Sequence, residues 1–551
     1  MADTVLALLG DEAAALGALH AGLDAAYGYP GTPSTEILEY LIGEYGAGHG
    51  PRAQWTVNEK TALEGALGVS YAGKRALVTM KHVGLNVAAD PFMNGALLGI
   101  KGGLVIAVAD DPGMHSSQNE QDSRFYAAFA MIPCLDPRSQ QEAYDMTREA
   151  FDISERFHIP VLLHLVTRLS HARGAVRTAA PRAGNPLGKA ENRAEWMLLP
   201  AHARRNYRSL IEKQTALEAW AEAHTTNRLE TADRDRLFVV VTAGLGGNYY
   251  DENERDLIAL RGAAPARLHI GTWPLPAAQI RELCREAKEL LIIEEGQPVI
   301  EEKIRGILPS HLVIRGKLDG TVIRAGELDP ETARRAMGLP PRKNLLAVHG
   351  DALALPAIPG RPPQLCAGCP HRDSFDAIKK AAQGLEPAAI TADIGCYALG
   401  ASPPYEVPET IVCMGASIGM AKGASDAGIT HAFAVIGDST FLHSGIPPLI
   451  DAAAANTPMT VIILDNAIVA MTGCQETALP SEKLRGLVLA LGVEPSHVVE
   501  LEAKPALVEE NAARLRAEAA YRGLSVVIFR RECLEALRKR RKQTKKAGGA
   551  A

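Results

Sequence analysis

Asp438 and Asn466 are the first residues in this sequence whose types and spacing could do chemistry. Asp438 follows an apolar run at 432–436, and Asn466 follows a second run at 460–464. Both runs are predicted to be buried strands joined by a helix. Since the carboxyl ends of neighbouring parallel strands share one sheet edge, where ligands bind, the two side chains are expected to lie together. Hard oxygen ligands of this kind hold Mg²⁺, which commonly bridges to phosphates.

Gly437-Asp438, followed 28 residues later by Asn466, resembles the diphosphate-binding pattern of thiamine-diphosphate enzymes. The resemblance implies that Asp438, Asn466 and the main-chain carbonyl of Ile468 bind Mg²⁺, with Gly437 and Ser439 beside the cofactor. Most such enzymes have glycine where this chain has serine. Without the flanking strands, a loop aspartate that caps a helix would explain the motif equally well.

A carboxylate that binds N1′ of the aminopyrimidine ring is the second requirement of a thiamine site. That contact promotes deprotonation of C2, while the carbanion chemistry belongs to the cofactor. Glu59 lies in the string VNEK at 57–60, before a predicted small-residue helix at 61–73. This stretch resembles the turn that carries the family carboxylate. Taken alone, Glu59 could equally be a first-turn glutamate that interacts with the helix dipole.

The string YGYPGTPSTE at 27–36 resembles the substrate loop of 2-oxoacid:ferredoxin oxidoreductases, a family of thiamine-diphosphate enzymes. The resemblance implies that Thr32 binds the substrate carboxylate. Pro and Gly favour a rigid turn before a helix that begins near Ser34, with Ser34 or Thr35 as its N-cap. A helix N-terminus favours an anion. A turn followed by a capped helix is the alternative when the string is taken alone.

Two polar strings, at 80–91 and 110–124, follow further predicted strands. The resemblance implies that they lie near the cofactor and the substrate, with Asn86 as a cofactor-binding residue and Arg124 as a catalytic one. The same resemblance places four other side chains there: Lys81, His82, Ser116 and Ser117.

Four cysteines have the layout of a metal site. Cys366 and Cys369 form a Cys-x-x-Cys pair, Cys396 follows in an Ile-Gly-Cys string, and Cys533 comes after the last predicted strand. The family layout implies that these thiolates hold one 4Fe–4S cluster near the thiamine ring. Structural zinc, or no metal, stays open as an alternative. The remaining cysteines are expected to be packed in the core or near the cofactor without binding metal: Cys134, Cys284, Cys413 and Cys474.

The resemblance covers nearly the whole chain and is strongest to α subunits of indolepyruvate:ferredoxin oxidoreductases and related arylpyruvate enzymes, through strings such as IEEGQPVIEE at 293–302 and MTGCQE at 471–476. It implies a smaller β subunit, coenzyme A, an arylpyruvate-type 2-oxoacid and a ferredoxin-like acceptor, in a dimer of αβ heterodimers. Members commonly end in a ferredoxin-like domain with two cysteine-rich motifs. This chain ends in a Lys/Arg segment, which leaves the electron acceptor open.

The fold is predicted to be α/β, with several doubly wound parallel-sheet domains. Linker-like sequence at 178–193 and a Pro-rich stretch at 354–363 separate the domains. The expected domains are a pyrimidine-binding (Pyr-type) domain at 1–190, a helical linker at 191–235, a transketolase C-terminal-like domain at 236–350, a diphosphate-binding (PP-type) domain at 360–537 and a flexible basic tail at 538–551. Strands are predicted at 75–80, 103–109, 160–166, 237–243, 290–294, 411–414, 432–436, 460–464 and 525–529, and helices at 201–228 and 446–455.

Composition excludes several other classes of protein. The 551 residues carry a formal net charge of -6, which gives no reason to expect nucleic acid or an anionic membrane as a partner. No apolar run approaches the ~20 residues of a spanning helix, and no signal peptide is visible. The chain is therefore expected in the cytoplasm, where cysteines stay reduced.

Together these features predict oxidative decarboxylation of a 2-oxoacid, with electrons that leave through the cluster. A non-oxidative thiamine decarboxylase is the nearest alternative, because it would share Asp438, Asn466 and Glu59 but have no use for the four thiolates. A non-catalytic thiamine-diphosphate-binding subunit is the alternative from another class.

Overall fold

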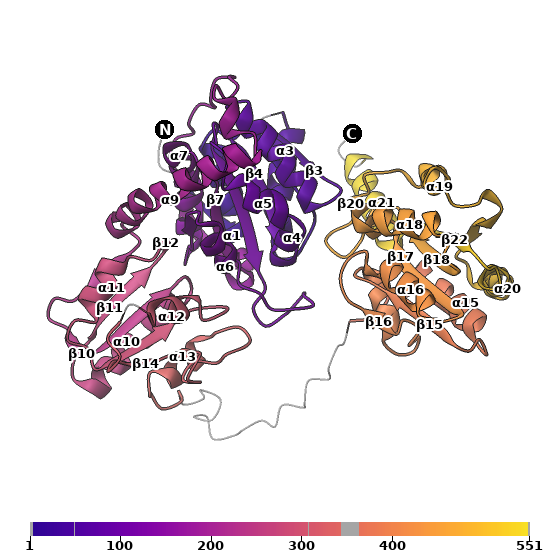
Figure 1. Cartoon of the computed structure of the whole chain (residues 1–551). Helices are drawn as coiled ribbons and strands as arrows, with labels where there is room; N and C mark the ends of the chain where they lie inside the picture. Colours follow the sequence, from indigo (N-terminus) through magenta and orange to yellow (C-terminus); the bar gives the residue numbers. More distant parts are fainter. Residues whose placement is uncertain (1–3, 49, 307, 343–362, 549–551) are drawn as a thin grey trace. The chain divides into compact units, whose positions relative to one another are not determined.

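The computed structural model describes residues 4–48, 50–306, 308–342 and 363–548, with side chains through residue 541 (Figure 1). The chain forms two compact units, Met1–Ala354 and Leu355–Ala551, and each is described here by itself. The predicted Pro-rich boundary at 354–363 lies outside the described residues except for its last one. None of the described helices is long and apolar enough to cross a membrane.

Unit 1 contains a seven-stranded sheet in the order β12-β6-β7-β5-β4-β2-β3. Strands β4, β5 and β7 are buried along their whole lengths, as continuous apolar runs are when helices cover both faces of a parallel sheet. These three strands confirm the predictions at 75–80, 103–109 and 160–166. The strand bounds are β2 (Ala25–Gly28), β3 (Arg52–Trp55), β4 (Ala76–Lys81), β5 (Leu104–Asp110), β6 (Cys134–Leu135), β7 (Val161–Val166) and β12 (Thr272–Trp273).

Helices on this sheet begin at its carboxyl edge and carry the residues of interest. They are α1 (Gly10–His20), α2 (Thr35–Gly46), α3 (Glu59–Tyr71), α4 (His82–Val87), α5 (Ala89–Gly95), α6 (Arg124–Ala130), α7 (Gln140–Phe157) and α8 (Thr167–His171). A short antiparallel pair, β1 (Val5–Leu9) with β8 (Arg173–Arg177), brings the N-terminal segment beside the end of α8. The sequence did not predict this pair.

A second sheet of unit 1 has the order β14-β13-β10-β11-β9. The long helix α9 (Pro200–Ala223) precedes it and confirms most of the helix predicted at 201–228, although Arg228 already begins β9. Bounds are β9 (Arg228–Glu230), β10 (Asp235–Ala243), β11 (Pro265–Ile270), β13 (Glu289–Ile293) and β14 (Val313–Arg315), with helices α10 (Gly246–Arg261), α11 (Ala277–Leu283), α12 (Val299–Ile304) and α13 (Pro330–Ala336).

The two sheets of unit 1 are joined more closely than separate domains would be. Strand β12 comes from the second segment but pairs antiparallel with β6, at the end of the first sheet. Arg124 also links them, because it pairs with Asp122 at 2.6 Å and with Glu294 at 3.3 Å, and donates to the carbonyl of Glu295 at 2.7 Å. The predicted domains at 1–190 and 236–350 therefore belong to one compact unit.

His164 lies in the same buried network, between two carboxylates. Its Nε2 is 2.9 Å from Asp110 Oδ2 and its Nδ1 is 3.0 Å from Asp136 Oδ1. Burial lowers the pKa of His164, but the two carboxylates outweigh it and raise the pKa to about 10. Because the folded-state pKa exceeds the unfolded value near 6.5, this ion contributes stability below pH ~6.5 that is lost as the pH rises toward 10.

The His164→Gln variant should therefore be less stable than the wild type at pH 7. The difference in unfolding free energy between the two proteins should shrink as the pH rises. At pH 7 the variant lacks a cation between two buried carboxylates, and we expect a loss of roughly 3 kcal/mol. Near pH 10 the wild-type imidazole loses its proton too, so the unfolding midpoints should approach each other. Thermal unfolding of both proteins at intervals from pH 7 to 10 checks this; a constant difference would contradict the assignment.

Unit 2 is a six-stranded parallel sheet in the order β16-β15-β17-β18-β22-β21. Chain order reverses between β15 and β17, and such switch points are where open α/β sheets bind ligands. The strands are β15 (Ala388–Ala392), β16 (Thr410–Ile411), β17 (His431–Gly437), β18 (Met459–Asp465), β21 (Val498–Glu502) and β22 (Leu524–Arg530). Its longer helices are α15 (Pro370–Ala382), α16 (Ala416–Asp426), α18 (Ile446–Ala454), α19 (Ser481–Ala490), α20 (Val508–Ala519) and α21 (Leu534–Gly548).

Two predictions for unit 2 differ from the structure. The strand predicted at 411–414 ends at Ile411, because the chain turns there through Gly415, at φ +84, into α16. The basic segment predicted as a flexible tail at 538–551 is helical through Gly548, as part of α21. Leu, Ala, Glu, Lys, Arg and Gln are all strong helix formers, which explains its conformation. The other predicted strands of this unit, and the helix at 446–455, are confirmed.

Candidate active site

Asp438 and Asn466 follow the paired strands β17 and β18, so the predicted juxtaposition is confirmed. Asp438 accepts hydrogen bonds from the main-chain N–H of Ser439 and from that of Ala467, each at 2.8 Å. Asn466 Oδ1 accepts one from the N–H of Ile468 at 3.1 Å. The loop after β18 is thereby held against the end of β17, and the oxygen ligands expected for Mg²⁺ converge.

Asp465 adds a second carboxylate that the sequence analysis missed. Asp438 and Asp465 are 6% and 4% exposed, and burial together with the charge of Asp465 raises the pKa of Asp438 well above its usual range. Arg530 supplies a cation beside Asp465, and a bound Mg²⁺ would supply one for Asp438. This donor set fits Mg²⁺, which takes carboxylate, amide and carbonyl oxygens. The signal was available, because Asp465 directly precedes Asn466.

Gly437 and Ser439 complete the turn after β17. A Cβ at Gly437 would lie 2.7 Å from the ring of Tyr397, so only glycine fits beside this ring. Tyr397 in turn donates to Asp393, which also accepts from the hydroxyl of Ser417 at 2.5 Å. Burial raises the pKa of Asp393 to about 6. Asp393 and Tyr397 were not singled out from sequence, although they flank Cys396 in the string DIGCY.

Asp438→Asn should change ligand binding and stability in opposite directions. Loss of one carboxylate should weaken binding of Mg²⁺–thiamine diphosphate roughly 100-fold, because truncating a buried charged contact costs about 2–5 kcal/mol. The same change removes the cost of burying a carboxyl group beside Asp465, so the ligand-free protein should melt at a higher temperature than the wild type. Equilibrium dialysis and thermal unfolding measure the two effects, with the exposed Asp451→Asn as a control that should change neither.

The four predicted cluster cysteines line a single cavity of about 90 Å³: Cys366, Cys369, Cys396 and Cys533. Cys369 is the N-cap of α15, and Cys533 directly precedes α21, so two helix N-termini face this cavity. Helix N-termini favour negative charge, such as an anionic iron–sulfur cluster carries. Burial raises the pKa of Cys369 to about 11 and that of Cys396 to about 12, so these thiols need a metal to become thiolates.

The spacing of these sulfurs bears on the choice between zinc and a cluster. Among the described residues, two groups of three metal-binding side chains have ligand atoms within 4.8 Å of one another. Neither group contains a cysteine. Tetrahedral zinc with sulfurs at ~2.3 Å would bring its four ligands within about 4 Å of one another. A 4Fe–4S cubane places its irons between the four thiolates, so it requires sulfurs that lie farther apart. As placed, the four sulfurs are therefore not in the geometry of a tetrahedral zinc site.

Asn466 connects the two halves of this site. The main-chain N–H of Cys533 donates to the carbonyl of Asn466 at 3.2 Å, and the Asn466 amide lies 3.3 Å from Nε2 of His371. Both Asn466 and His371 line the cysteine cavity. Burial lowers the pKa of His371 to about 4, which keeps the imidazole neutral and able to accept a hydrogen bond. The diphosphate residues and the cluster residues are thus in direct contact.

The burial of the other cysteines agrees only in part with the prediction from sequence. Cys134 and Cys284 are buried, as predicted. Cys413 is exposed rather than packed, because the turn before α16 replaces the predicted strand. Cys474 is half-buried at φ +66 and faces a second, larger cavity.

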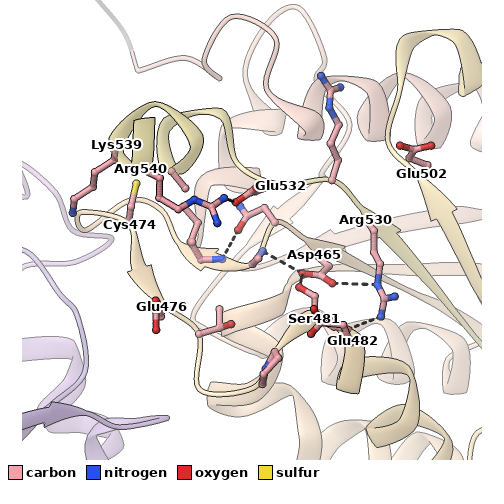
Figure 2. A pocket seen from close by; sticks show the side chains of 17 residues that line it. Asp465, Cys474, Glu476, Ser481, Glu482, Glu502, Arg530, Glu532, Lys539 and Arg540 are labelled. Carbon is pink, nitrogen blue, oxygen red and sulfur yellow. Dashed lines mark hydrogen bonds and ion pairs between the residues drawn. The ribbon is translucent and has the colours of Figure 1, made fainter. Parts of the chain in front are cut away.

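That larger cavity, of about 1000 Å³, opens at the carboxyl ends of β18 and β22 (Figure 2). Asn466 and Ile468 are among its lining residues, so it adjoins the diphosphate site. Arg530 points toward Asp465, at 3.4 Å, and donates to the carbonyl of Ser481. Lys539 of α21 donates to the carbonyl of Gly473 at 2.8 Å, so the basic segment holds the loop at 471–476 in place.

Unit 1 holds the predicted pyrimidine-binding carboxylate. Glu59 is the first residue of α3 and is 5% exposed, while Asn58 caps the helix by accepting from the N–H of Thr61 at 2.9 Å. A Cβ at Gly84 would lie 2.5 Å from Oε1 of Glu59, so this glycine leaves room for the carboxylate. Glu59 is therefore buried at a sheet edge, whereas an ordinary glutamate in the first turn of a helix is solvated.

Thr32 lies in the turn between β2 and α2, as expected. The helix begins at Thr35 with Ser34 as its N-cap, and the turn is closed by the Ser34 hydroxyl, which donates to the carbonyl of Gly31 at 2.8 Å. Thr35 Oγ1 accepts from the N–H of Gly31 at 3.1 Å. Thr32 itself is half-buried in this turn.

The polar strings at 80–91 and 110–124 meet through Lys81 and Asp111. Lys81 donates to the carbonyl of Ser116 at 2.5 Å, and Asp111 accepts from the hydroxyl of Ser117. Burial lowers the pKa of Lys81 to about 8 although Asp111 opposes the shift. His82 is 1% exposed and contacts Asn119 at 3.2 Å. This part of the prediction is a coherent polar cluster in unit 1.

The surroundings of Asn86 and Arg124 differ from those of Lys81 and His82. Asn86 is exposed on α4 and accepts from the hydroxyl of Tyr126 at 2.7 Å. Arg124 is 1% exposed and is enclosed by the carboxylates of Asp122, Asp136 and Glu294. That enclosure supports a structural role for Arg124 instead of the predicted contact with substrate. Glu59 and Thr32 belong to unit 1, whereas Asp438, Asn466 and the cysteines belong to unit 2.

Comparison with known proteins agrees with this division. The family described as "Pyruvate flavodoxin/ferredoxin oxidoreductase, thiamine diP-bdg" matches residues 16–234, and the one described as "Thiamine pyrophosphate enzyme, C-terminal TPP binding domain" matches residues 393–520. Indolepyruvate oxidoreductase subunit IorA of Archaeoglobus fulgidus is 37% identical over 96% of this chain and 86% of the relative. The chain belongs to the IorA family. The family resemblance expected from the sequence is thereby confirmed.

IorA relatives from other archaea are equally similar. The subunit of Methanothermobacter marburgensis is 37% identical over 96% of this chain and 87% of its own length, and that of Pyrococcus abyssi is 36% identical over 96% and 85%. Among solved structures, the fold resembles a 2-oxoglutarate:ferredoxin oxidoreductase from Magnetococcus marinus with 2-oxoglutarate, coenzyme A and succinyl-CoA bound. That match has a TM-score of 0.50 at 16% identity and covers 61% of this chain and 66% of the other. It supports the predicted α/β fold class with parallel sheets.

Proposed function

We propose that this chain is the thiamine-diphosphate-bearing α subunit of an enzyme that oxidatively decarboxylates an arylpyruvate-type 2-oxoacid, such as an indolepyruvate or phenylpyruvate, with coenzyme A as acyl acceptor. The observation that carries the proposal is the contact of Asn466, in the diphosphate site, with the cavity lined by four thiols. A decarboxylase without a redox step has no use for those thiols. The names of the curated relatives support the choice of indolepyruvate.

The reaction balances with a one-electron acceptor of the ferredoxin type as its oxidant. One 2-oxoacid and one coenzyme A thiol give one acyl-CoA, one CO₂, one proton and two electrons. The bond between the keto carbon and the carboxyl carbon breaks, and a carbon–sulfur bond forms. When bound, thiamine diphosphate supplies the carbanion chemistry at the keto carbon, and a 4Fe–4S cluster passes the electrons singly to a ferredoxin-like acceptor.

The residues of this chain bind and orient the reacting groups. Thr32 holds the substrate carboxylate at the start of α2, and Glu59 holds a proton at N1′ of the aminopyrimidine ring. Asp438, Asn466 and the carbonyl of Ile468 hold Mg²⁺ on the diphosphate. Gly437, Ser439 and Asn86 contribute to the cofactor cradle, and the cluster is held by Cys366, Cys369, Cys396 and Cys533.

A smaller β subunit is the proposed partner, because the curated relatives are named as one subunit of an enzyme. We propose a dimer of αβ heterodimers that works with ferredoxin or another low-potential acceptor. The test is anaerobic co-expression with the β subunit, iron and zinc analysis, and a screen of 2-oxoacids with coenzyme A and a viologen dye.

We expect a brown protein with about four irons per αβ unit that reduces the dye fastest with an aromatic 2-oxoacid. Aldehyde release without dye reduction would favour the non-oxidative decarboxylase. A colourless protein that contains zinc, or one that binds thiamine diphosphate without turnover, would overturn the proposal.

A further inference from the structure

Three metal-ligating side chains converge in unit 1 where α1, α2 and α8 meet. Asp11 is the second residue of α1, Glu36 the second of α2 and His171 the last of α8. One ligand atom from each lies within 4.8 Å of the other two. His171 Nε2 is 3.5 Å from Glu36 Oε2. None of these residues belongs to the diphosphate or cluster sites.

Asp11 is fully buried, with 0% exposure, and neither of its carboxylate oxygens accepts a hydrogen bond. The Ser170 hydroxyl, also 0% exposed, lies near enough to Asp11 to lower its pKa as a donor, but the two groups are not in the geometry of a good hydrogen bond. Glu36 Oε2 is a further buried oxygen that has no hydrogen bond in good geometry, although it is ion-paired with His171 Nε2 at 3.5 Å. A buried oxygen that stays unsatisfied destabilises the folded protein.

A shared proton is one way to satisfy part of this cluster. Burial raises the pKa of Asp11 to about 8, so its carboxyl group could carry a proton toward Glu36. That arrangement satisfies one oxygen of Asp11 and leaves its second oxygen and the Ser170 hydroxyl unexplained. In that arrangement the imidazole of His171 is the ion-pair partner of Glu36, on the open side of the cluster.

We propose that Asp11, Glu36 and His171 bind one divalent transition-metal ion, best matched by Zn²⁺. Two carboxylates and one imidazole are a known type of three-ligand zinc set, and they leave a fourth position for water. Imidazole disfavours Mg²⁺ and Ca²⁺ as the resident ion, since these prefer all-oxygen shells. The side chains of Glu36 and His171 are 38% and 36% exposed, which provides an entry path from solvent.

The position of this site gives the metal a structural task. It would tie the first turn of α2 to α1 and α8, directly after the turn that carries Thr32. Helix α1 already packs against both other helices, so the ion would fix existing contacts instead of bringing distant parts together. This inference concerns metal binding alone and stands whether or not the chain oxidises 2-oxoacids.

The test measures zinc bound to the αβ complex with its cluster loaded. Wild type and the variants Asp11→Asn and His171→Gln are dialysed against micromolar Zn²⁺ with excess Mg²⁺, which keeps the diphosphate site occupied. A pH near 8 is chosen because the Glu36 carboxylate raises the pKa of His171, and the metal must displace that proton. Iron content is matched between samples, so that empty cysteine sites do not take up zinc unequally.

His115→Gln is the matched control. His115 Nε2 also lies 3.5 Å from a glutamate oxygen, in Glu327, but among the described residues no third metal-binding side chain lies within 4.8 Å of that pair. We expect about one equivalent of Zn²⁺ in the wild type and the control, and about one fewer in both site variants. Zinc should also raise the unfolding temperature of the wild type and not that of the site variants.

Equal zinc content in all four proteins, or no zinc in the wild type, would overturn the proposal in favour of the proton-sharing carboxyl pair. His171→Gln keeps the test decisive if Asp11→Asn folds poorly, because His171 is partly exposed and its replacement leaves the core intact. An anomalous difference peak at the zinc edge, located between α1, α2 and α8, would provide an independent confirmation.

Discussion

Glu59→Gln should abolish 2-oxoacid-dependent reduction of a viologen dye, with a rate roughly 10²–10⁴-fold below that of the wild type. Glutamine has nearly the same shape, so it should fit beside Gly84 and leave the fold intact. It cannot hold a titratable proton at N1′ of the aminopyrimidine ring. The effect should therefore fall on kcat, while the unfolding temperature changes little. Steady-state assays with the αβ complex, together with thermal unfolding, measure both quantities.

Glu64→Gln is the matched control for this prediction. Glu64 lies on the same helix, α3, but is exposed and pairs only with Lys60 at the surface. Such exposed pairs contribute about 0–1 kcal/mol, so the control should keep its activity and its stability. If Glu59→Gln retained more than about a tenth of the wild-type rate, Glu59 would not be the general acid–base group proposed here.

Cys396→Ser should remove the broad visible absorbance near 400 nm, most of the iron and nearly all dye reduction. A neutral serine hydroxyl replaces a thiolate in a cavity that needs four sulfur ligands. The cavity is small and lined by apolar atoms as well, so the fold of unit 2 should survive. Iron analysis, electron paramagnetic resonance of the reduced protein and the dye assay measure the three effects.

Cys413→Ser serves as the control, because Cys413 belongs to unit 2 but is exposed and does not line the cavity. It should keep the iron and the colour of the wild type. Iron content that does not change in Cys396→Ser, or zinc in place of iron in the wild type, would refute the assignment of these four cysteines. Because Cys396 is not one of the proposed Mg²⁺ ligands, thiamine-diphosphate affinity should change by less than about tenfold.

The sequence contained enough information for the diphosphate site. Apolar runs before Asp438 and before Asn466 mark two strands, and a helix between them forces the strands to be parallel. Parallel neighbours end at the same sheet edge, so the contact follows from local patterns alone. Asp465 was equally visible beside Asn466, but a carboxylate at a strand end can face either side. Its pairing with Asp438 required the actual register of β17 and β18.

The cysteine cavity and the Arg124 network required more than sequence. Cys396 and Cys533 come together because β22 pairs with β18, a long-range contact that no local pattern specifies. Arg124 looked like a functional arginine in a polar string, yet segment 294–297 packs over it and supplies carboxylate and carbonyl partners. Whether a polar side chain faces a ligand or its own protein depends on which distant segment covers it.

By itself, the sequence determined the α/β class, most of the strands, the family and the residue types available for thiamine diphosphate, Mg²⁺ and four thiolate ligands. These depend on hydrophobic period, turn residues and short motifs, which act over a few residues. Only the tertiary structure decided that residues 1–354 form one unit, that the basic segment is helical and that Asp11, Glu36 and His171 converge. Those outcomes depend on packing between segments far apart in the chain, where burial and charge are fixed by the whole fold.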